Sequence, residues 1–141
     1  MRLAAEVEVH GRVIPIRPSM VRRAVRAVVA GERKRVVVSV TFVGREGMRR
    51  LNRIHKGHDR PTDVISFTLQ DPCRGRIGDI YICRWQAARE AERRGIPLRE
   101  ELVRLVVHGT LHVLGHDHPA RADRERSAMW RRQERYVRKL A

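Results

Sequence analysis

The chain has 141 residues, of which 31 are Lys or Arg and 16 are Asp or Glu, so its formal net charge is +15. This length fits one domain, residues 1–141, with an ordinary hydrophobic core. The longest strongly apolar run, residues 36–43, is too short to span a bilayer, and the acidic start of the chain is unlike a signal peptide. The two cysteines form no metal or redox motif. We therefore expect a cytoplasmic protein with reduced thiols and no membrane partner.

Hydrophobic periodicity predicts four strands and five helices in chain order. The strands are expected at residues 6–9, 36–43, 64–69 and 77–83. The helices are expected at 18–30 (ended by Gly31), 45–55 and 84–94, then from 97 or 98 through His112, and from 120 to 140. The last helix would bury Met129, Trp130, Tyr136 and Val137. The order β-α-β-α-β-β-α-α-α predicts an α/β domain, in which about five helices pack a small mixed sheet of about four strands.

The positive charge is concentrated at the two ends of the chain. Residues 1–60 hold 15 basic and 5 acidic side chains, residues 61–120 hold 8 of each, and residues 121–141 hold 8 and 3. Such a distribution attracts a polyanion, and a nucleic acid is the obvious candidate. Because 28 of the 31 basic residues are Arg, compositional bias is the alternative explanation.

Residues 108–118 read HGTLHVLGHDH and hold four of the seven histidines. His108 and His112 are four apart on a predicted helix, so their imidazoles lie on one face, one turn apart. Gly115 allows the chain to turn back through a left-handed conformation and to deliver His118 from another direction. Three imidazoles with one open position are the plan of a catalytic zinc site. We therefore predict one zinc ion per chain, held by His108, His112 and His118.

The residues around the three histidines distinguish this motif from a protease site. The spacing H-x-x-x-H-x-x-G-x-x-H is that of the metzincin proteases, which carry a Glu base directly after the first His. Gly109 occupies that position here, so we expect no ordinary proteolysis. His116 is either solvated or packed on the turn, or it supports a metal ligand without binding the metal, or it is itself an alternative ligand. Asp117 either caps the turn or orients a ligand imidazole.

A second polar segment, residues 51–67, reads LNRIHKGHDRPTDVISF. Taken alone, its Pro-Thr-Asp run has the composition of an ordinary turn. Together with Gly78-Asp79-Ile80 and the histidine motif, however, it resembles the YbeY family of bacterial endoribonucleases. That family combines an LN…R…TDVLSF stretch, a GDI strand and HGxLHLxGYDH in the same order. The resemblance covers residues 36–130.

The resemblance implies both an activity and a site. It implies a zinc-dependent, single-strand-specific endoribonuclease of 16S rRNA 3′-end maturation and ribosome quality control, with rRNA, the small ribosomal subunit and assembly proteins as partners and no DNA. The histidines matching His108, His112 and His118 would bind the metal. The family's catalytic Arg falls on Lys56, which keeps the charge without the bidentate fork. The family's Tyr falls on His116.

Several questions of mechanism and function stay open at this level. The attacking group is either water or the RNA 2′-hydroxyl, and Asp63 and Asp117 are candidate proton carriers. One alternative function is a non-catalytic, zinc-stabilised factor that binds rRNA during ribosome assembly. Another is a metal-dependent hydrolase of a different substrate, against which the missing Glu and the positive charge both argue.

Overall fold

The structure is a computed structural model that describes residues 5–116 and 127–141. Its four strands are β1 (Ala5–His10), β2 (Val36–Val43), β3 (Val64–Asp71) and β4 (Gly75–Cys83). Its helices are α1 (Pro18–Glu32), α2 (Arg45–Lys56), α3 (Arg84–Arg94), α4 (Leu98–Val113) and α5 (Ala128–Leu140). The predicted α/β architecture and element order are confirmed.

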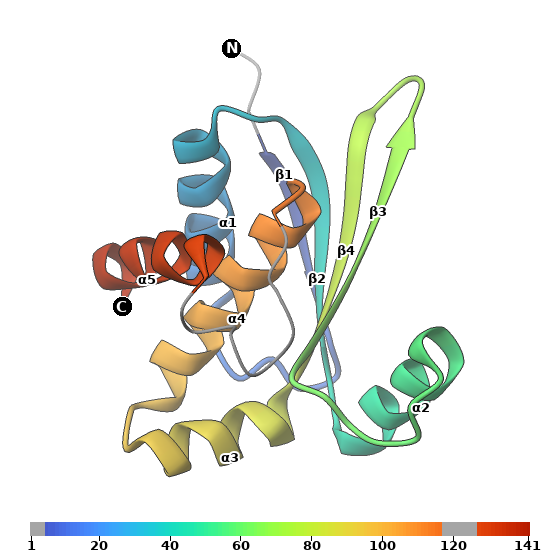
Figure 1. Cartoon of the computed structure of the whole chain (residues 1–141), viewed down its shortest axis with the longest axis vertical. Helices are drawn as coiled ribbons and strands as arrows, with labels where there is room; N and C mark the ends of the chain where they lie inside the picture. The colour runs from blue at the N-terminus through green and yellow to red at the C-terminus, as the bar shows by residue number, and fades with distance from the viewer. Residues whose placement is uncertain (1–4, 117–126) are drawn as a thin grey trace.

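The strands form one mixed sheet in the order β1-β2-β4-β3 (Figure 1). β2 pairs in parallel with both β1 and β4, and β3 pairs antiparallel with β4. The parallel pairs need crossover connections, which α1 provides between β1 and β2. The β3–β4 hairpin is longer than predicted, because its polar tip continues the pairing to Asp71 and Gly75. In Figure 1 this hairpin projects beyond the helices.

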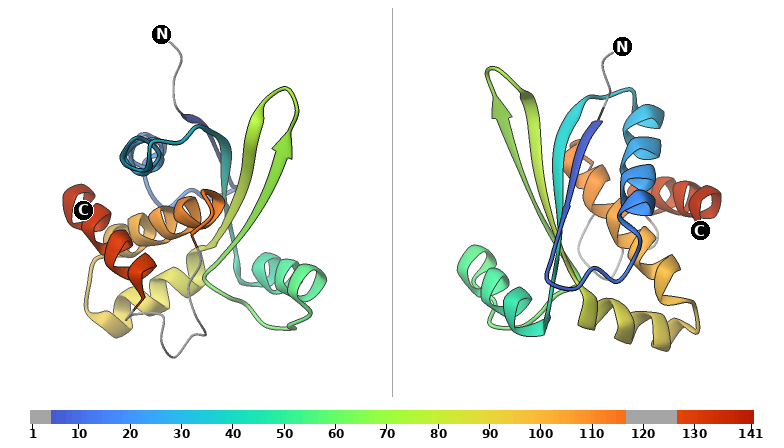
Figure 2. Two further views of the ribbon diagram at one scale, coloured as in Figure 1. Left: turned by 45° about the horizontal axis from the view of Figure 1, so that its top comes forward. Right: turned by 180° about the vertical axis from the view of Figure 1, so that it is seen from behind.

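Alternation along the strands divides the apolar residues between the two faces of the sheet. One face, here called the α4 side, packs against α1 and α4, which α5 covers in turn. It contains most of the core, including Val38, Val40 and Ile80. The opposite face, the α2 side, has a small cluster centred on Met48 and Ile65. Figures 1 and 2 show α2 apart from the other helices.

Helix α4 is the central element of the fold. Twelve of its sixteen residues are buried. A helix that is apolar on most sides requires neighbours on all of them, and α4 packs against the sheet, α1, α3 and α5. The side chains that α4 carries are therefore held in a rigid environment.

Two helix boundaries differ from the predictions. Gly31 does not end α1 but lies inside it, and a Cβ there would come within 2.2 Å of the Tyr136 hydroxyl on α5. The glycine therefore allows α5 to lie close to α1. The left-handed residue that ends α1 is instead Arg33, with φ 56°. The prediction that the last helix runs through Ser127 is also wrong. Ser127 is the N-cap, and its hydroxyl accepts a hydrogen bond from the Trp130 amide.

The buried side of α5 also differs in part from the prediction. Met129 and Val137 are buried as expected, whereas Trp130 and Tyr136 are only half-buried. Residues 120–126 of the predicted helix lie outside the described residues. Cys73 is exposed and Cys83 is buried, and no disulfide joins them. In the parts of the chain that the structure describes, no helix is long and apolar enough to cross a membrane.

Candidate metal centre

His108 and His112 lie together on the last two turns of α4. Their ring centroids are 4.7 Å apart and the ring planes are inclined by 74°. His108 is 3% exposed, and His112 is half-buried. The i, i+4 spacing has therefore brought two imidazoles to one face of a rigid helix, as the sequence predicts.

The chain turns at the end of α4, as the presence of Gly115 led us to expect. Gly115 has φ 101°, in the left-handed region. The His116 amide donates to the Leu111 carbonyl at 2.9 Å, and the Gly115 amide donates to the His112 carbonyl at 3.0 Å. These two bonds form a Schellman motif, which ends a helix and redirects the chain. His118 and Asp117, the third predicted ligand and its neighbour, lie outside the described residues.

A side chain from the sheet also holds the C-terminal end of α4 in place. Arg76 on β4 donates from Nη1 to the carbonyl oxygen of Val113 at 2.7 Å. This oxygen is one of the last carbonyls of the helix, where a cation also complements the helix dipole. The turn that carries the histidine motif is thus held by a charged contact from a strand.

Two glycines allow α4 to lie close against β4. A Cβ on Gly109 would come within 2.6 Å of Ile80 Cγ2, and a Cβ on Gly78 within 2.4 Å of Val113 Cγ1. Position 109 faces the sheet, so the Glu that metzincin proteases carry there has no space in this fold. The missing protease base therefore follows from helix–sheet packing.

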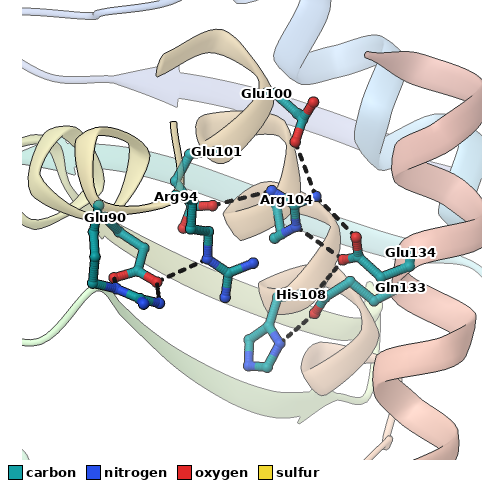
Figure 3. A network of polar contacts seen from close by, with 9 residues as sticks. Glu90, Arg94, Glu100, Glu101, Arg104, His108, Gln133 and Glu134 are labelled. Atoms are coloured by element: carbon teal, nitrogen blue, oxygen red, sulfur yellow. Dashed lines mark hydrogen bonds and ion pairs between the residues drawn. The ribbon is translucent and has the colours of Figure 1, made fainter. Parts of the chain in front are cut away.

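A polar network connects His108 to α5 (Figure 3). The His108 Nδ1 lies 2.7 Å from Gln133 Oε1, and Gln133 Nε2 donates to Glu134 at 3.0 Å. Arg104 donates two hydrogen bonds to Glu134, at 2.9 and 2.8 Å, and also binds Glu100 and Glu101. Gln133 is 1% exposed and Arg104 is 7% exposed. The network fixes α5 against the helix that carries the histidines.

Glu134 is held as a carboxylate inside this network. Burial opposes its ionisation, but hydrogen bonds from Arg104 and Gln133 outweigh burial and lower the pKa of Glu134 below its ordinary value. The hydrogen bond to Glu134, together with other carboxylate contacts, raises the pKa of Arg104 despite its burial. Both groups therefore stay charged at neutral pH.

His116 contacts a different helix, α1. Its Nε2 lies 2.7 Å from Glu32 Oε1 on α1. Tyr136 donates to the same carboxylate at 2.6 Å, and Arg132 donates to it at 3.1 Å. Burial of Glu32 is outweighed by these bonds, which lower its pKa, and burial together with Glu32 raises the pKa of Tyr136 to about 12. His116 thus fastens the turn to α1 and α5.

Lys56 lies on the α2 side of the sheet. Its Nζ is 5.9 Å from the centroid of the Phe67 ring, which also makes an edge contact with His55 at 4.8 Å. Within the described residues, no hydrogen bond, ion pair or ring contact joins Lys56 to His108 or His112. Asp63 accepts a hydrogen bond from the Val64 amide at 2.8 Å, which is the turn chemistry expected of it.

The donor chemistry of the α4 histidines fits a zinc ion. Among residues 5–116 and 127–141, no three His, Cys, Asp or Glu side chains form a metal-binding group. The two imidazoles in place are nitrogen ligands that zinc prefers, and the Nδ1 of His108 is already bonded to a side-chain oxygen, as ligating histidines usually are. The residues present therefore fit the metal.

Gln133, Arg104 and Glu134 are site residues that the sequence reasoning missed. A signal was present, because Gln133 lies four residues after Met129 and four before Val137, both buried on α5. A polar residue within an apolar stripe of a helix has to find a buried partner. The sequence alone does not say that this partner is His108.

The fold and the site together place the chain in a class of small α/β proteins. These proteins carry two histidines on a helix that ends in a Gly turn, with the spacing found in metal-dependent hydrolases. The sequence model of the family described as "Endoribonuclease YbeY" matches residues 11–141. The chain belongs to this family, whose members are named as RNA-cleaving enzymes.

Individual relatives agree with this assignment. Endoribonuclease YbeY of Persephonella marina is 39% identical over 103 residues, covering 70% of this chain and 67% of the relative. Endoribonuclease YbeY of Brevibacillus brevis is 34% identical and covers 98% and 97%. The solution structure of TM1509 from Thermotoga maritima is similar with a TM-score of 0.67 and 27% identity, over 95% of this chain and 88% of that one. For some curated relatives, the match covers less of the relative's own length, down to 57%.

Proposed function

We propose that this chain is a zinc-dependent endoribonuclease that cuts single-stranded rRNA in 16S 3′-end maturation and in ribosome quality control. The observation that carries the proposal is the His108–His112 pair at the end of α4, 4.7 Å between ring centroids, followed by the Gly115 turn in a chain of the YbeY family. His118 is proposed as the third ligand. The rRNA, the small ribosomal subunit and its assembly proteins are the proposed partners, in the cytoplasm.

The chemistry follows from the proposed ligand set. His108, His112 and His118 would hold a zinc ion, which would supply a bound water of lowered pKa and a Lewis acid for a phosphoryl oxygen, so that no Glu at position 109 would be needed. His108 and His112 would contribute ring nitrogens from a rigid helix, so their positions would be set before RNA binds.

Lys56 is proposed to neutralise a phosphate oxygen of the bound RNA. Its charge is retained although the family's Arg is replaced, and its side chain is exposed at the end of α2. Because it lies on the other side of the sheet from α4, this contact requires the RNA strand to reach both sides.

The test is cleavage of a 16S rRNA 3′-end precursor by the purified full chain. Wild type is compared with His112→Ala and with His10→Ala, which removes an exposed histidine of β1. We expect cutting by wild type and His10→Ala and a loss of at least about 100-fold with His112→Ala. Equal cutting by all three proteins would refute the proposed site. Bound zinc without any cutting would instead favour a non-catalytic, zinc-stabilised rRNA-binding factor of ribosome assembly.

A further inference from the structure

We propose that Gln133 is a positioning residue, whose side-chain amide fixes His108 in the tautomer that presents the Nε2 lone pair to a metal. The inference deepens the proposed function and rests on it, because it concerns how one proposed ligand is held. Gln133 touches neither substrate nor reacting atoms in this account and acts only through His108.

The orientation of the Gln133 amide follows from its second partner. An amide can present either its oxygen or its NH₂ group, and only the surrounding bonds decide between them. Gln133 Nε2 lies 3.0 Å from Glu134 Oε2, and an ionised carboxylate only accepts hydrogen bonds. The NH₂ group must therefore face Glu134, which leaves Oε1 facing His108 at 2.7 Å.

The orientation of the amide decides the tautomer of the imidazole. An amide oxygen accepts but does not donate, so the His108 Nδ1 must carry the proton. A neutral imidazole has one ring proton, so the second lone pair of the ring is then on Nε2. Figure 3 shows the ring reaching Gln133 through Nδ1 while its other nitrogen points away. This is the arrangement that ligating histidines usually have.

Arg104 makes this arrangement rigid. It precedes His108 by one turn of α4 and donates twice to Glu134, at 2.9 and 2.8 Å. The fork geometry keeps Glu134 in place as a carboxylate, and Glu134 in turn keeps the Gln133 amide from flipping. A chain of hydrogen bonds thus begins at a buried guanidinium and ends at the proposed zinc ligand.

The test measures zinc affinity by competition with a chromophoric chelator, starting from the zinc-loaded full chain. Gln133→Leu removes the acceptor, so the proton is free to move to Nε2, and we expect zinc affinity to fall by about 10- to 100-fold. A second readout is the ring N–H proton of His108 by NMR, slowly exchanging in wild type and fast in Gln133→Leu.

The matched control is Val137→Ala, one turn further along α5, which loosens the packing of that helix without removing a hydrogen bond. We expect it to lower the unfolding midpoint while zinc affinity stays unchanged. The inference is overturned if Gln133→Leu binds zinc like wild type, or if Val137→Ala loses as much affinity as Gln133→Leu. Wild type that binds no zinc through His112 would refute the proposed function itself, whereas zinc binding that depends on His112 but not on Gln133 would refute only this inference.

Discussion

On the α4 side of the sheet, the Arg104 side chain is 9% exposed and binds three carboxylates. On the α2 side, Arg49 forms a comparable fork with Asp59, but these side chains are 43% and 53% exposed. The bonds have similar lengths, and the surroundings differ. A buried network must be fully satisfied, whereas an exposed pair exchanges its partner for water at little cost. The α4 side is therefore suited to hold ligands rigidly, and the α2 side is suited to present charge to a flexible polyanion.

The largest loss of stability among these variants is expected for Arg104→Met. The change leaves the buried Glu101 and the half-buried Glu134 without their cation, and we expect the free energy of unfolding to fall by about 3–5 kcal/mol. Urea denaturation followed by circular dichroism measures the loss. Arg49→Met is the matched control and is expected to change stability far less. Comparable losses for the two variants would remove the distinction between the two sides.

Glycine replacements compare the packing of the two sides directly. In Gly109→Ala, the new Cβ meets Ile80 at 2.6 Å, and we expect a destabilisation of about 1–3 kcal/mol. In Gly47→Ala on α2, the nearest atom is 3.5 Å away, and better helix propensity is expected to stabilise the protein by about 0.5–1 kcal/mol. Thermal unfolding of both variants shows whether each replacement raises or lowers the stability. Stabilisation by Gly109→Ala would show that α4 does not pack closely on β4.

Lys56 tests whether the α2 side contacts RNA. We expect Lys56→Ala to weaken binding of single-stranded rRNA by about tenfold and to lower the salt dependence by about one counterion. Its stability should stay within about 0.5 kcal/mol of wild type, because the side chain is exposed. Filter binding at several salt concentrations measures the effect. Lys56→Arg, which restores the family's residue, should cut RNA at least as well as wild type. Unchanged RNA binding by Lys56→Ala would mean that the α2 side does not contact RNA through Lys56.

The smallest effect is expected at Glu90 on α3. Hydrogen bonds from Arg93, then Arg94, lower the pKa of Glu90 to about 2. Because the folded-state pKa is below the ordinary value of about 4.5, the contribution to stability is present above pH 4.5 and disappears as the pH falls toward 2. Solvent screening limits it to about 0.5 kcal/mol. Glu90→Gln should therefore reduce stability at pH 7 and match wild type near pH 2. An equal difference at both pH values would contradict this account.

The elements that the sequence predicted best are those with strong local signals. The strand 36–43 is a mostly apolar run rich in β-branched residues, and Gly44, Gly57 and Gly95 are found at helix ends. The Gly115 turn also follows from local chemistry, because a left-handed residue at a helix end favours glycine. Gly31 shows the limit of such reasoning, since its role depends on Tyr136, which lies 105 residues away in sequence.

The candidate site was predictable only in part for the same reason. The spacing of His108 and His112 is a local property of a helix, and the structure brings the two rings together. The partner of His108 comes from α5, and its identity depends on how two helices pack. The placement of Lys56 on the other side of the sheet likewise follows from the topology rather than from any nearby residue pattern.

The most direct test of the central claim is removal and return of zinc in an RNA-cleavage assay with the full chain. Zinc is stripped with a chelator, the metal content is measured, and cutting of the 16S rRNA 3′-end precursor is followed before and after one equivalent of zinc is added. The account predicts that cutting is lost with the metal, returns with it in wild type, and does not return in His112→Ala. Cutting that persists in the metal-free protein, or returns equally in His112→Ala, would contradict it.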